Sequence, residues 1–329
     1  MKKVVVVYST GGMGHKKAAM ALYEKFEKVE SVETEIIDTL DFGNKVYKFL
    51  YTDFYVAMMT KYKKLWGILY NFSDIGLVGK LLLKFREHFD LHSMKNLDKK
   101  LYEEKPDAIV TTHFILPAIA KELRSNPDFK AKLYVVVTDY GPHSFWLSEG
   151  IDKFFVGADS MIPLMEKKGV PSSKLKVVGI PTVENFSKDY DIEKLRNEFG
   201  LDPNRKTIFM LSGGFGVGPM EQILKELNSV NSDMQVITVC GYNEQAFESI
   251  SAMKSELNYP VVVFGFTDKI AELMTVSDLM ITKAGGISIT EAMNMQLPMI
   301  LIDSIPGQES WNEELLLSNG AAEKAHSIS

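Results

Sequence analysis

Leu279-Met280-Ile281-Thr282-Lys283-Ala284-Gly285-Gly286-Ile287-Ser288-Ile289-Thr290-Glu291-Ala292 is the stretch that decides the fold. Its apolar start predicts a strand over Leu279–Ile281, and a helix is expected just after the two glycines, with Glu291 in its first turn. Ligands of open α/β sheets bind at the carboxyl ends of the strands. A helix N-terminus at such an edge offers free N–H groups and a positive dipole end to phosphates. The stretch therefore indicates a nucleotide diphosphate carrying a polyhydroxylated group.

A second strand, expected over Met299–Ile302, leads to Pro306-Gly307-Gln308-Glu309 and then Asn312. These polar side chains are predicted at the same sheet edge, where carboxylate and amide groups suit sugar hydroxyls. A plainer interpretation also fits the first stretch. Ser288-x-x-Glu291 matches a capping box, in which Glu291 would bond only to a backbone N–H.

Strand and helix patterns alternate along the whole chain, which predicts doubly wound parallel sheets. The pattern restarts after a hinge expected over 179–190, so we expect an N-terminal domain at 1–180 and a C-terminal domain at 181–329. The expected strands are Val4–Tyr8, Thr34–Asp38, Ala108–Thr112, Leu133–Thr138, Lys153–Val156, Leu175–Val178, Ile208–Leu211, Gln235–Val239, Val261–Phe264, Leu279–Thr282 and Met299–Ile302. A helix is predicted after Pro219, which suits a first helical position.

Composition narrows the class of protein. With 329 residues the chain is long for one core. Its single cysteine, Cys240, follows an apolar run, so a buried thiol is expected rather than a disulfide or a nucleophile. We expect no signal peptide and no spanning helix. Residues 1–180 carry a charge balance of +5 and residues 181–329 one of −11, so the first half is expected to meet an anionic surface.

Three polar segments of the first half follow predicted strands. They are Gly11-Gly12-Met13-Gly14-His15, Thr111-Thr112-His113-Phe114 and Asp139-Tyr140-Gly141-Pro142-His143-Ser144-Phe145-Trp146. The second and third segments are expected to open onto the ligand-bearing edge, and the first forms the turn between a strand and a helix. The alternatives are a plain strand-to-helix turn with an incidental His15, a helix cap for Asp139 and core packing for Trp146. Asp189-Tyr190-Asp191, the only Asp-x-Asp, is expected to be a cap rather than a metal site.

The order Lys-x-Gly-Gly-x-x-x-x-Glu-Ala followed by Pro-Gly-Gln-Glu-x-x-Asn resembles the donor-site block of glycosyltransferase family 28. It is most similar to the monogalactosyldiacylglycerol synthases and the bacterial processive diacylglycerol glucosyltransferases. The resemblance implies the GT-B fold, two Rossmann-like domains with a cleft between them. It implies that Glu291 grips the ribose of UDP and that Gln308 and Glu309 face the sugar. It also places Asn312 nearby and makes Lys283, Gly285 and Gly286 part of the donor site.

The resemblance extends over Val4–Ala322 and implies further roles. The donor site would include Gly213 and Gly214 at the phosphates, with Phe266 and Thr267 at the uracil. The acceptor side would be lined by Gly12, Gly14, His113, His143 and Trp146. Either Asp139 or His15 would be the general base, with Asp139 ranked slightly higher. The family continues past the segment matching 319–322, so the C-terminal domain is expected to be truncated.

The implied activity is inverting transfer of glucose or galactose from UDP-glucose or UDP-galactose to diacylglycerol or a monoglycosyldiacylglycerol. No metal, other cofactor or nucleic acid is expected, and the protein would be cytoplasmic and peripheral on the inner face of the membrane. Three alternatives stay open. They are a lipid-II-type N-acetylglucosaminyltransferase, a UDP-N-acetylglucosamine 2-epimerase and a catalytically weak UDP-sugar-sensing partner protein.

Residues 42–92 interrupt the strand–helix rhythm over a length too great for an ordinary connection. Aromatic residues are interleaved there with lysines, among them Lys61, Lys63, Lys64 and Trp66. This pattern suits an interfacial amphipathic element, and with the resemblance it predicts contact with an anionic membrane. The alternative is a set of helices that pack on the first domain with their lysines solvated.

Overall fold

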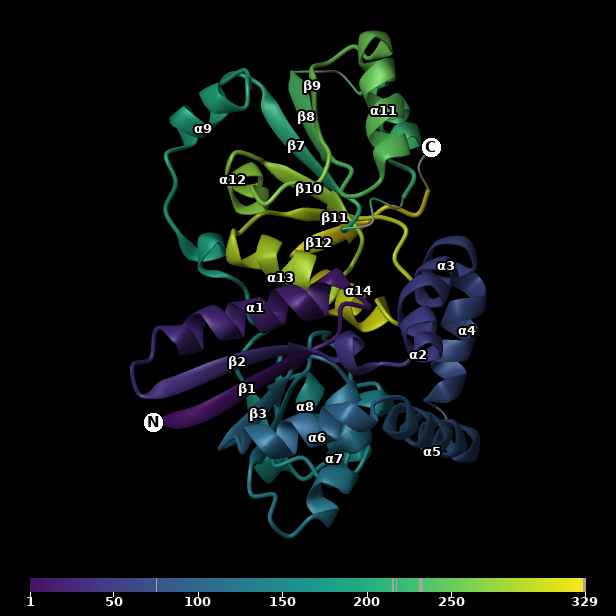
Figure 1. The fold of residues 1–329 in the computed structure, drawn as a ribbon. Coiled ribbons are helices and arrows are strands. Elements are labelled where there is room, and N and C mark those ends of the chain that lie inside the picture. Colours follow the sequence, from purple (N-terminus) through teal and green to yellow (C-terminus); the bar gives the residue numbers. More distant parts are fainter. Residues whose placement is uncertain (75, 215, 217, 231–232, 328–329) are drawn as a thin grey trace. The chain divides into compact units, whose positions relative to one another are not determined.

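The computed structural model describes residues 1–74, 76–214, 216, 218–230 and 233–327. The chain divides into two compact units (Figure 1). Unit 1 contains Met1–Val183 and Pro306–Trp311, and unit 2 contains Glu184–Ile305 and Asn312–Ser329. The segment Pro306–Trp311 thus belongs to unit 1, whereas the sequence grouped it with the C-terminal domain.

Unit 1 is built on a parallel sheet that has six strands within the described residues, in the order β2-β1-β3-β4-β5-β6. The strands are β1 (Lys2–Tyr8), β2 (Val32–Asp38), β3 (Ala108–Thr111), β4 (Lys132–Val136), β5 (Lys153–Val156) and β6 (Leu175–Val177). Register is regular: Val5 of β1 lies between Glu35 of β2 and Ile109 of β3. The carboxyl ends of the strands therefore share one edge, where the polar segments begin.

The valine run of β1 is buried because both faces of this sheet are covered. Val4 and Val6 pack with Ala19 of the helix that follows β1, whereas Val5 and Val7 belong to the larger core on the opposite face. Side chains alternate between the two faces of a strand, so a strand covered on both sides is apolar throughout. This arrangement explains why the run has no polar positions.

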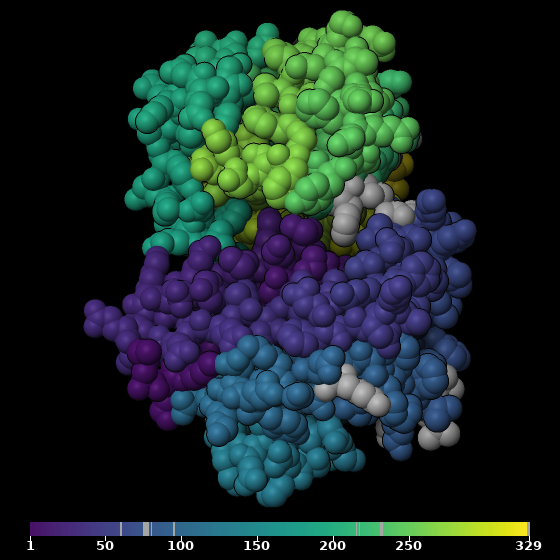
Figure 2. All heavy atoms as spheres, viewed as in Figure 1, coloured from purple at the N-terminus to yellow at the C-terminus, as the bar shows by residue number. Residues whose placement is uncertain are grey.

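Helices of unit 1 cover the sheet and add a helical lobe at one side (Figures 1 and 2). The helices are α1 (Met13–Glu27), α2 (Lys45–Phe49), α3 (Tyr55–Lys61), α4 (Lys63–Ser73), α5 (Gly76–Ser93), α6 (Lys95–Glu104), α7 (Ile115–Ser125) and α8 (Met161–Lys167). The lobe consists of α2 to α5. A π-helical turn, η2 (Leu50–Phe54), joins α2 to α3, and a short 3-10 helix, η3 (Ser144–Trp146), follows β4.

Unit 2 repeats the plan with a parallel sheet in the order β12-β11-β10-β7-β8-β9, six strands in the part of the chain that is described. The strands are β7 (Lys206–Leu211), β8 (Met234–Val239), β9 (Val261–Phe264), β10 (Leu279–Thr282), β11 (Met299–Leu301) and β12 (Ala322–Lys324). The helices are α9 (Ile192–Glu198), α10 (Met220–Leu227), α11 (Glu244–Met253), α12 (Ile270–Thr275), α13 (Gly286–Asn294) and α14 (Ser310–Ser318).

The strands predicted from the sequence are present, with small shifts at their ends. The structure also contains β12, which the sequence did not predict. This strand is short, lies at the sheet edge and exposes Glu323 and Lys324. Pro219 is the N-cap of α10 rather than its first residue. Asp191 caps α9 by accepting a hydrogen bond from the N–H of Lys194 at 3.0 Å, which confirms that prediction.

Candidate active site

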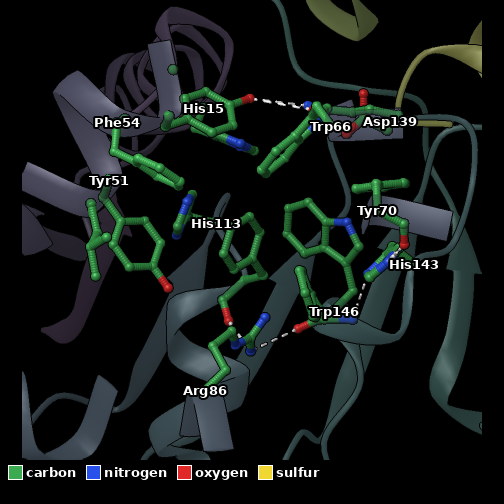
Figure 3. Close-up of a pocket in the computed structure, with 17 residues that line it drawn as sticks. His15, Tyr51, Phe54, Trp66, Tyr70, Arg86, His113, Asp139, His143 and Trp146 are labelled. Atoms are coloured by element: carbon green, nitrogen blue, oxygen red, sulfur yellow. Dashed lines mark hydrogen bonds between the residues drawn. The ribbon is translucent and has the colours of Figure 1, made fainter. Parts of the chain in front are cut away.

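A cavity of about 220 Å³ lies in unit 1 at the carboxyl edge of the sheet (Figure 3). Of the residues predicted for the acceptor side and for the base, Gly12, His15, His113, Asp139, His143 and Trp146 line it, and Gly14 does not. They come from the turns after β1, β3 and β4, which are far apart in the sequence. Parallel strands bring these turns to one edge, so the structure assembles the predicted group.

His15, the third residue of α1, has a defined tautomer. Its Nδ1 lies 2.7 Å from the carbonyl oxygen of Thr112 and 3.0 Å from Oγ1 of Thr138. A carbonyl only accepts, so Nδ1 carries the proton and Nε2 keeps its lone pair. Within the described residues Nε2 makes no hydrogen bond. Burial lowers the pKa of His15 to about 4, against a smaller opposing effect of the Thr112 carbonyl, so the ring is neutral at pH 7.

His143 uses both ring nitrogens for structure. Its Nδ1 accepts a hydrogen bond from the N–H of Phe145 at 3.1 Å, which caps η3. Nε2 therefore carries the proton and faces the carbonyl of Tyr70 at 3.1 Å and Oγ of Ser73 at 3.2 Å. Burial lowers the pKa of His143 to about 4. The ring fastens α4 to the turn after β4 and has no lone pair left for proton transfer.

His113 is a buried packing residue. Its ring contacts that of His15 edge-on, with centroids 4.7 Å apart, and lies 4.0 Å from the ring of Phe114. Nδ1 of His113 is buried and has no hydrogen-bond partner among the residues that the structure describes. Burial lowers the pKa of His113 well below its usual value. The ring therefore holds His15 in place from one side.

Asp139 is half-buried at the cavity wall, just beyond β4. It is not the cap of the nearby helix, because His143 occupies that position in η3. Trp146 satisfies both interpretations given to it, since it is buried in the main core and also lines the cavity. Asp139 and His15 thus share one cavity, and both remain candidates for the base.

The aromatic wall of the cavity was not recognised from the sequence. Tyr51, Tyr55, Trp66, Tyr70, Phe114 and Phe145 contribute to it. The sequence placed several of these in a membrane-facing segment, because an amphipathic pattern does not tell which apolar face turns inward. Trp66 is the clearest correction: it is half-buried at the cavity and its Nε1–H donates to Oε1 of Gln308 at 3.2 Å.

Arg86 of α5 supports this wall from behind. Its guanidinium lies 4.4 Å from the ring centroid of Phe145 and 5.1 Å from that of Phe114. It also forms an ion pair with the fully buried Asp90 at 3.4 Å, and the hydroxyl of Tyr51 donates to Asp90 at 3.0 Å. Burial raises the pKa of Asp90 to about 6, although Arg86 and Tyr51 oppose the effect. The basic residue and its carboxylate thus hold two aromatic rings at the cavity.

The outer face of the helical lobe exposes large apolar side chains. Ile68, Leu81 and Phe85 are 65%, 70% and 71% exposed. Further exposed members are Val46, Phe49, Tyr62, Leu65, Leu69, Phe72 and Leu82. Phe54 is also partly exposed, but it lines the cavity. Lys61 and Lys64 are exposed beside them, and Lys63 is half-buried. The predicted segment also includes Ile75 and the side chain of Lys80, which lie outside what the structure describes. No helix in the described ranges is long and apolar enough to cross a membrane.

Gln308 also lines this cavity, since Pro306–Trp311 is part of unit 1. Its Nε2 donates to the hydroxyl of Tyr55 at 3.2 Å. Glu309 is buried in the same segment. Of the two residues predicted to face the sugar, Gln308 therefore lines the His15 cavity, and Glu309 follows Gln308 directly in the chain.

The carboxyl edge of the unit 2 sheet carries the remaining residues that were predicted for the donor site. Gly213, after β7, has a φ of +72°, which a residue with a side chain rarely adopts. The carbonyl of Gly214 accepts from the N–H of Tyr242 at 3.1 Å, and the Tyr242 ring stacks on Phe266 with centroids 4.4 Å apart. Both rings are more than half exposed. Phe215 and Val217, also in this predicted turn, lie outside the described residues.

Tyr242 was missed by the sequence argument. It follows β8 as Phe266 follows β9, and β8 pairs with β9. That adjacency was the available signal. Thr267, next to Phe266, accepts from the N–H of Lys269 through Oγ1 at 3.2 Å, so its hydroxyl shapes the turn.

The glycine turn after β10 opens α13 as predicted, but Glu291 is not in the first turn. Gly285 is the N-cap, with no side-chain capping bond, and the first turn holds no acidic residue. Ser288 and Glu291 both lie inside the helix, so the capping-box interpretation is wrong. Lys283 is half-buried beside this turn, and Glu291 is buried, 2% exposed. The N-cap residue itself, Gly285, therefore supplies no side-chain cap to the first N–H groups of the helix.

Asn312 fixes this turn from the next helix. It is fully buried, and its Nδ2 donates to the carbonyl of Ala284 at 2.9 Å. This hydrogen bond holds the backbone just before Gly285 and Gly286. The motif spacing that suggested a donor site thus corresponds to a direct contact.

Two further expectations concern metals and thiols. Within the described ranges, no group of three or more His, Cys, Asp or Glu side chains is arranged to hold a metal ion. Cys240 is buried, and burial raises its pKa to about 11, so it is a packing residue rather than a nucleophile.

Two Rossmann-like units with glycine-rich and polar turns at their carboxyl edges define the GT-B class of fold. MurG from Acinetobacter baumannii superposes with a TM-score of 0.63 at 14% identity, covering 99% of this chain and 86% of that one. A UDP co-structure of S. aureus MnaA superposes with a TM-score of 0.59 at 16% identity, covering 97% and 88%. These identities establish the fold alone.

The family follows from sequence models. Residues 15–182 match monogalactosyldiacylglycerol (MGDG) synthase, and residues 213–321 match the glycosyltransferase family 28 C-terminal domain. The chain belongs to this family of glycosyltransferases. A processive diacylglycerol beta-glucosyltransferase from Bacillus cytotoxicus is 30% identical over 322 residues, which cover 97% of this chain and 81% of the relative. The predicted family and fold are confirmed.

Proposed function

We propose that this protein transfers glucose or galactose from a UDP-sugar to diacylglycerol or a monoglycosyldiacylglycerol, with inversion and without a metal ion. The name of the 30%-identical relative supports the reaction type and the acceptor. The observation that carries the proposal is the cavity of unit 1. It combines an aromatic wall with a neutral His15 whose Nε2 lone pair is available.

The cavity is the proposed acceptor site. Aromatic side chains suit the glycerol backbone and the first methylenes of an acyl chain, and His15 or Asp139 would take the proton of the attacking hydroxyl. Because burial lowers the pKa of His15 to about 4, its proton affinity is low in the free enzyme. A neighbouring carboxylate such as Asp139 would favour the imidazolium that forms during transfer. We therefore assign both residues to proton transfer, and the kinetics of single variants identify which of them accepts the proton of the hydroxyl.

The turns of unit 2 are the proposed donor site. Gly213, Gly214 and the glycine-rich start of α13 would offer backbone N–H groups to the diphosphate, which departs as UDP. Glu291 would accept from the ribose hydroxyls, and Phe266 with Tyr242 would contact the uracil. Gln308 and Glu309 would contact the sugar.

The outer face of the helical lobe is the proposed membrane contact. Exposed apolar side chains of α4 and α5 lie next to exposed Lys61 and Lys64, as in an interfacial element. An anionic leaflet attracts such lysines. We therefore place the protein peripherally on the cytoplasmic face of the membrane, where a lipid acceptor is available.

The test is product analysis by mass. The protein is incubated with diacylglycerol vesicles and, separately, with UDP-glucose, UDP-galactose and UDP-N-acetylglucosamine. We expect a hexosyl lipid from one of the first two donors. Transfer only from UDP-N-acetylglucosamine, or 2-epimerisation of that donor, would support the alternatives instead. UDP-sugar binding with no transfer to any lipid would indicate a sensing protein.

A further inference from the structure

The segment Pro306–Trp311 is seated on helix α4 through closely fitted backbone. A Cβ added at Gly67 would lie 2.8 Å from both Cβ and the carbonyl oxygen of Pro306, so only glycine permits this approach. Gly307 has a φ of +82°, and a Cβ there would lie 2.8 Å from Oδ1 of Asn71. The N–H of Gly307 donates to Oγ of Ser310 at 2.9 Å, which closes the turn. The path of this segment is therefore set by α4.

The carboxamide of Gln308 is held in one orientation. The indole Nε1–H of Trp66 can only donate, so the atom 3.2 Å away must be Oε1. Nε2 then faces the hydroxyl of Tyr55 at 3.2 Å. Burial raises the pKa of Tyr55 to about 12, against the opposing hydrogen bond of Gln308, so this hydroxyl keeps its proton at neutral pH. A flipped amide would place an N–H against the indole N–H.

The hydroxyl of Tyr55 also lies 3.5 Å from Oε1, so the oxygen faces both Trp66 and Tyr55, and this orientation leaves Gln308 with one N–H of Nε2 for a ligand. An N–H donor with a fixed direction distinguishes hydroxyl groups by direction. Glucose and galactose differ only in the direction of one hydroxyl, so a carboxamide that cannot flip is suited to select between them.

We propose that Trp66 and Tyr55 are positioning residues that fix the Gln308 carboxamide and thereby set the donor-sugar selectivity of the enzyme. This inference rests on the proposed function, in which Gln308 contacts the sugar. It adds that helices α3 and α4 of the lobe, rather than unit 2 alone, determine which UDP-hexose is used. Neither Trp66 nor Tyr55 touches the reacting atoms in this role.

The test compares Trp66→Phe and Tyr55→Phe with the parent protein. Each variant keeps an aromatic side chain and removes the N–H or O–H group that faces the Gln308 carboxamide. The binding constants of UDP, UDP-glucose and UDP-galactose are measured, together with kcat/KM for both donors. We expect the preference between the two hexoses to fall about threefold to tenfold, the effect of one neutral hydrogen bond, with UDP affinity unchanged. Tyr23→Phe is the matched control, since Tyr23 lies on α1 and does not line the cavity.

A double-variant cycle separates positioning from general stability. In a Gln308→Ala background, Trp66→Phe should cause no further loss of selectivity, because the group that it positions is absent. Additive losses, or an equal loss of UDP affinity, would overturn the inference. If Trp66→Phe does not fold, Tyr55→Phe alone carries the test. Absence of lipid glycosylation by the parent overturns the proposed function instead, and the ratio of UDP-hexose to UDP affinity still tests the inference.

Discussion

The helical lobe of unit 1 has two faces that are both rich in apolar side chains but have different surroundings. On the inner face, Tyr55, Trp66 and Tyr70 line a cavity and contact polar partners. On the outer face, Ile68 and Phe72 of α4, the helix that also contains Trp66 and Tyr70, are exposed. Aromatic and aliphatic residues thus serve a binding site on one side and an exposed surface on the other. The comparison teaches that an apolar residue in this lobe has no assigned role until its face is known.

The cavity that the inner face lines should control chemistry, and the largest effects are expected for the residues opposite the lobe. His15→Ala and Asp139→Asn should each slow hexosyl transfer by about 10²–10⁴-fold, the usual range for loss of a general base. Transfer is measured with saturating donor and lipid, and UDP affinity is measured beside it. UDP affinity should be retained, since neither residue is assigned to the nucleotide. Near-parental turnover in both variants would leave the reaction without a base in this cavity.

Unit 2 offers a comparison for the inner face, because Glu291 is assigned to binding rather than chemistry. Glu291→Ala should weaken UDP binding by about 1.5–3 kcal/mol, the range for a hydrogen bond to a charged group. Titration calorimetry gives the affinity and a thermal melt gives the stability. A lower melting temperature with unchanged UDP affinity would show that the buried carboxylate serves the fold alone.

Gln308→Ala and Glu309→Ala should separate recognition of the sugar from binding of the nucleotide. Each should reduce transfer and UDP-hexose affinity by about tenfold, while UDP itself still binds, because these residues are assigned to the sugar. Isothermal titration with UDP and with the UDP-hexose distinguishes the two. Equal losses for both ligands would contradict the assignment.

The outer face should control membrane association. Lys61→Glu with Lys64→Glu and Ile68→Ser should weaken vesicle binding by at least about 2 kcal/mol, since each basic residue near an anionic leaflet contributes about 1 kcal/mol. Liposome flotation at low and high salt measures it. Trp66→Phe is the matched inner-face change and should float like the parent. Unaltered flotation of the outer-face variant, or no flotation of the parent, would overturn the membrane assignment.

Acidification should lower the stability of the folded protein through the buried histidines around the cavity. His15 and His143 have a folded pKa of about 4, below the usual 6.5, so the unfolded chain binds more protons between these values. Stability is therefore lost as the pH falls, by about 0.7 kcal/mol for each histidine between pH 7 and pH 6. Asp90, with a pKa raised to about 6, opposes this with a gain of about half that size. Urea midpoints at both pH values measure the slope, and a midpoint that rises on acidification would contradict it.

Much of this molecule was predictable from the sequence because parallel strands covered on both faces are apolar throughout. Val4–Val7 and Val236–Val239 are examples, and the polar residues after such strands must share an edge. The grouping of His113 and Asp139 follows from that rule alone, and the family resemblance added His15. The motif order also indicated the family.

Other features depended on long-range packing that no local pattern encodes. The inward turn of Trp66 depends on Gln308, which lies far along the chain. The membership of Pro306–Trp311 in unit 1 depends on the absence of a side chain at Gly67. The position of Glu291 inside α13 depends on where that helix starts, and two adjacent glycines left this undecided.

The π-helical turn η2 sets the direction in which the side chains after it point around the helix axis. A π turn contains more residues than an α turn, so it rotates the residues that follow it relative to those before it. Here Leu50, Tyr51, Phe54 and Tyr55 all line the cavity across this turn, and a Cβ on Gly11 would lie only 2.6 Å from the carbonyl oxygen of Tyr51. Deleting Asp53 would turn Tyr55 by about 100° away from Gln308 without changing a single lining residue. Insertions and deletions of one residue, rather than substitutions, are therefore the changes by which relatives of this chain would most sharply re-aim their cavities.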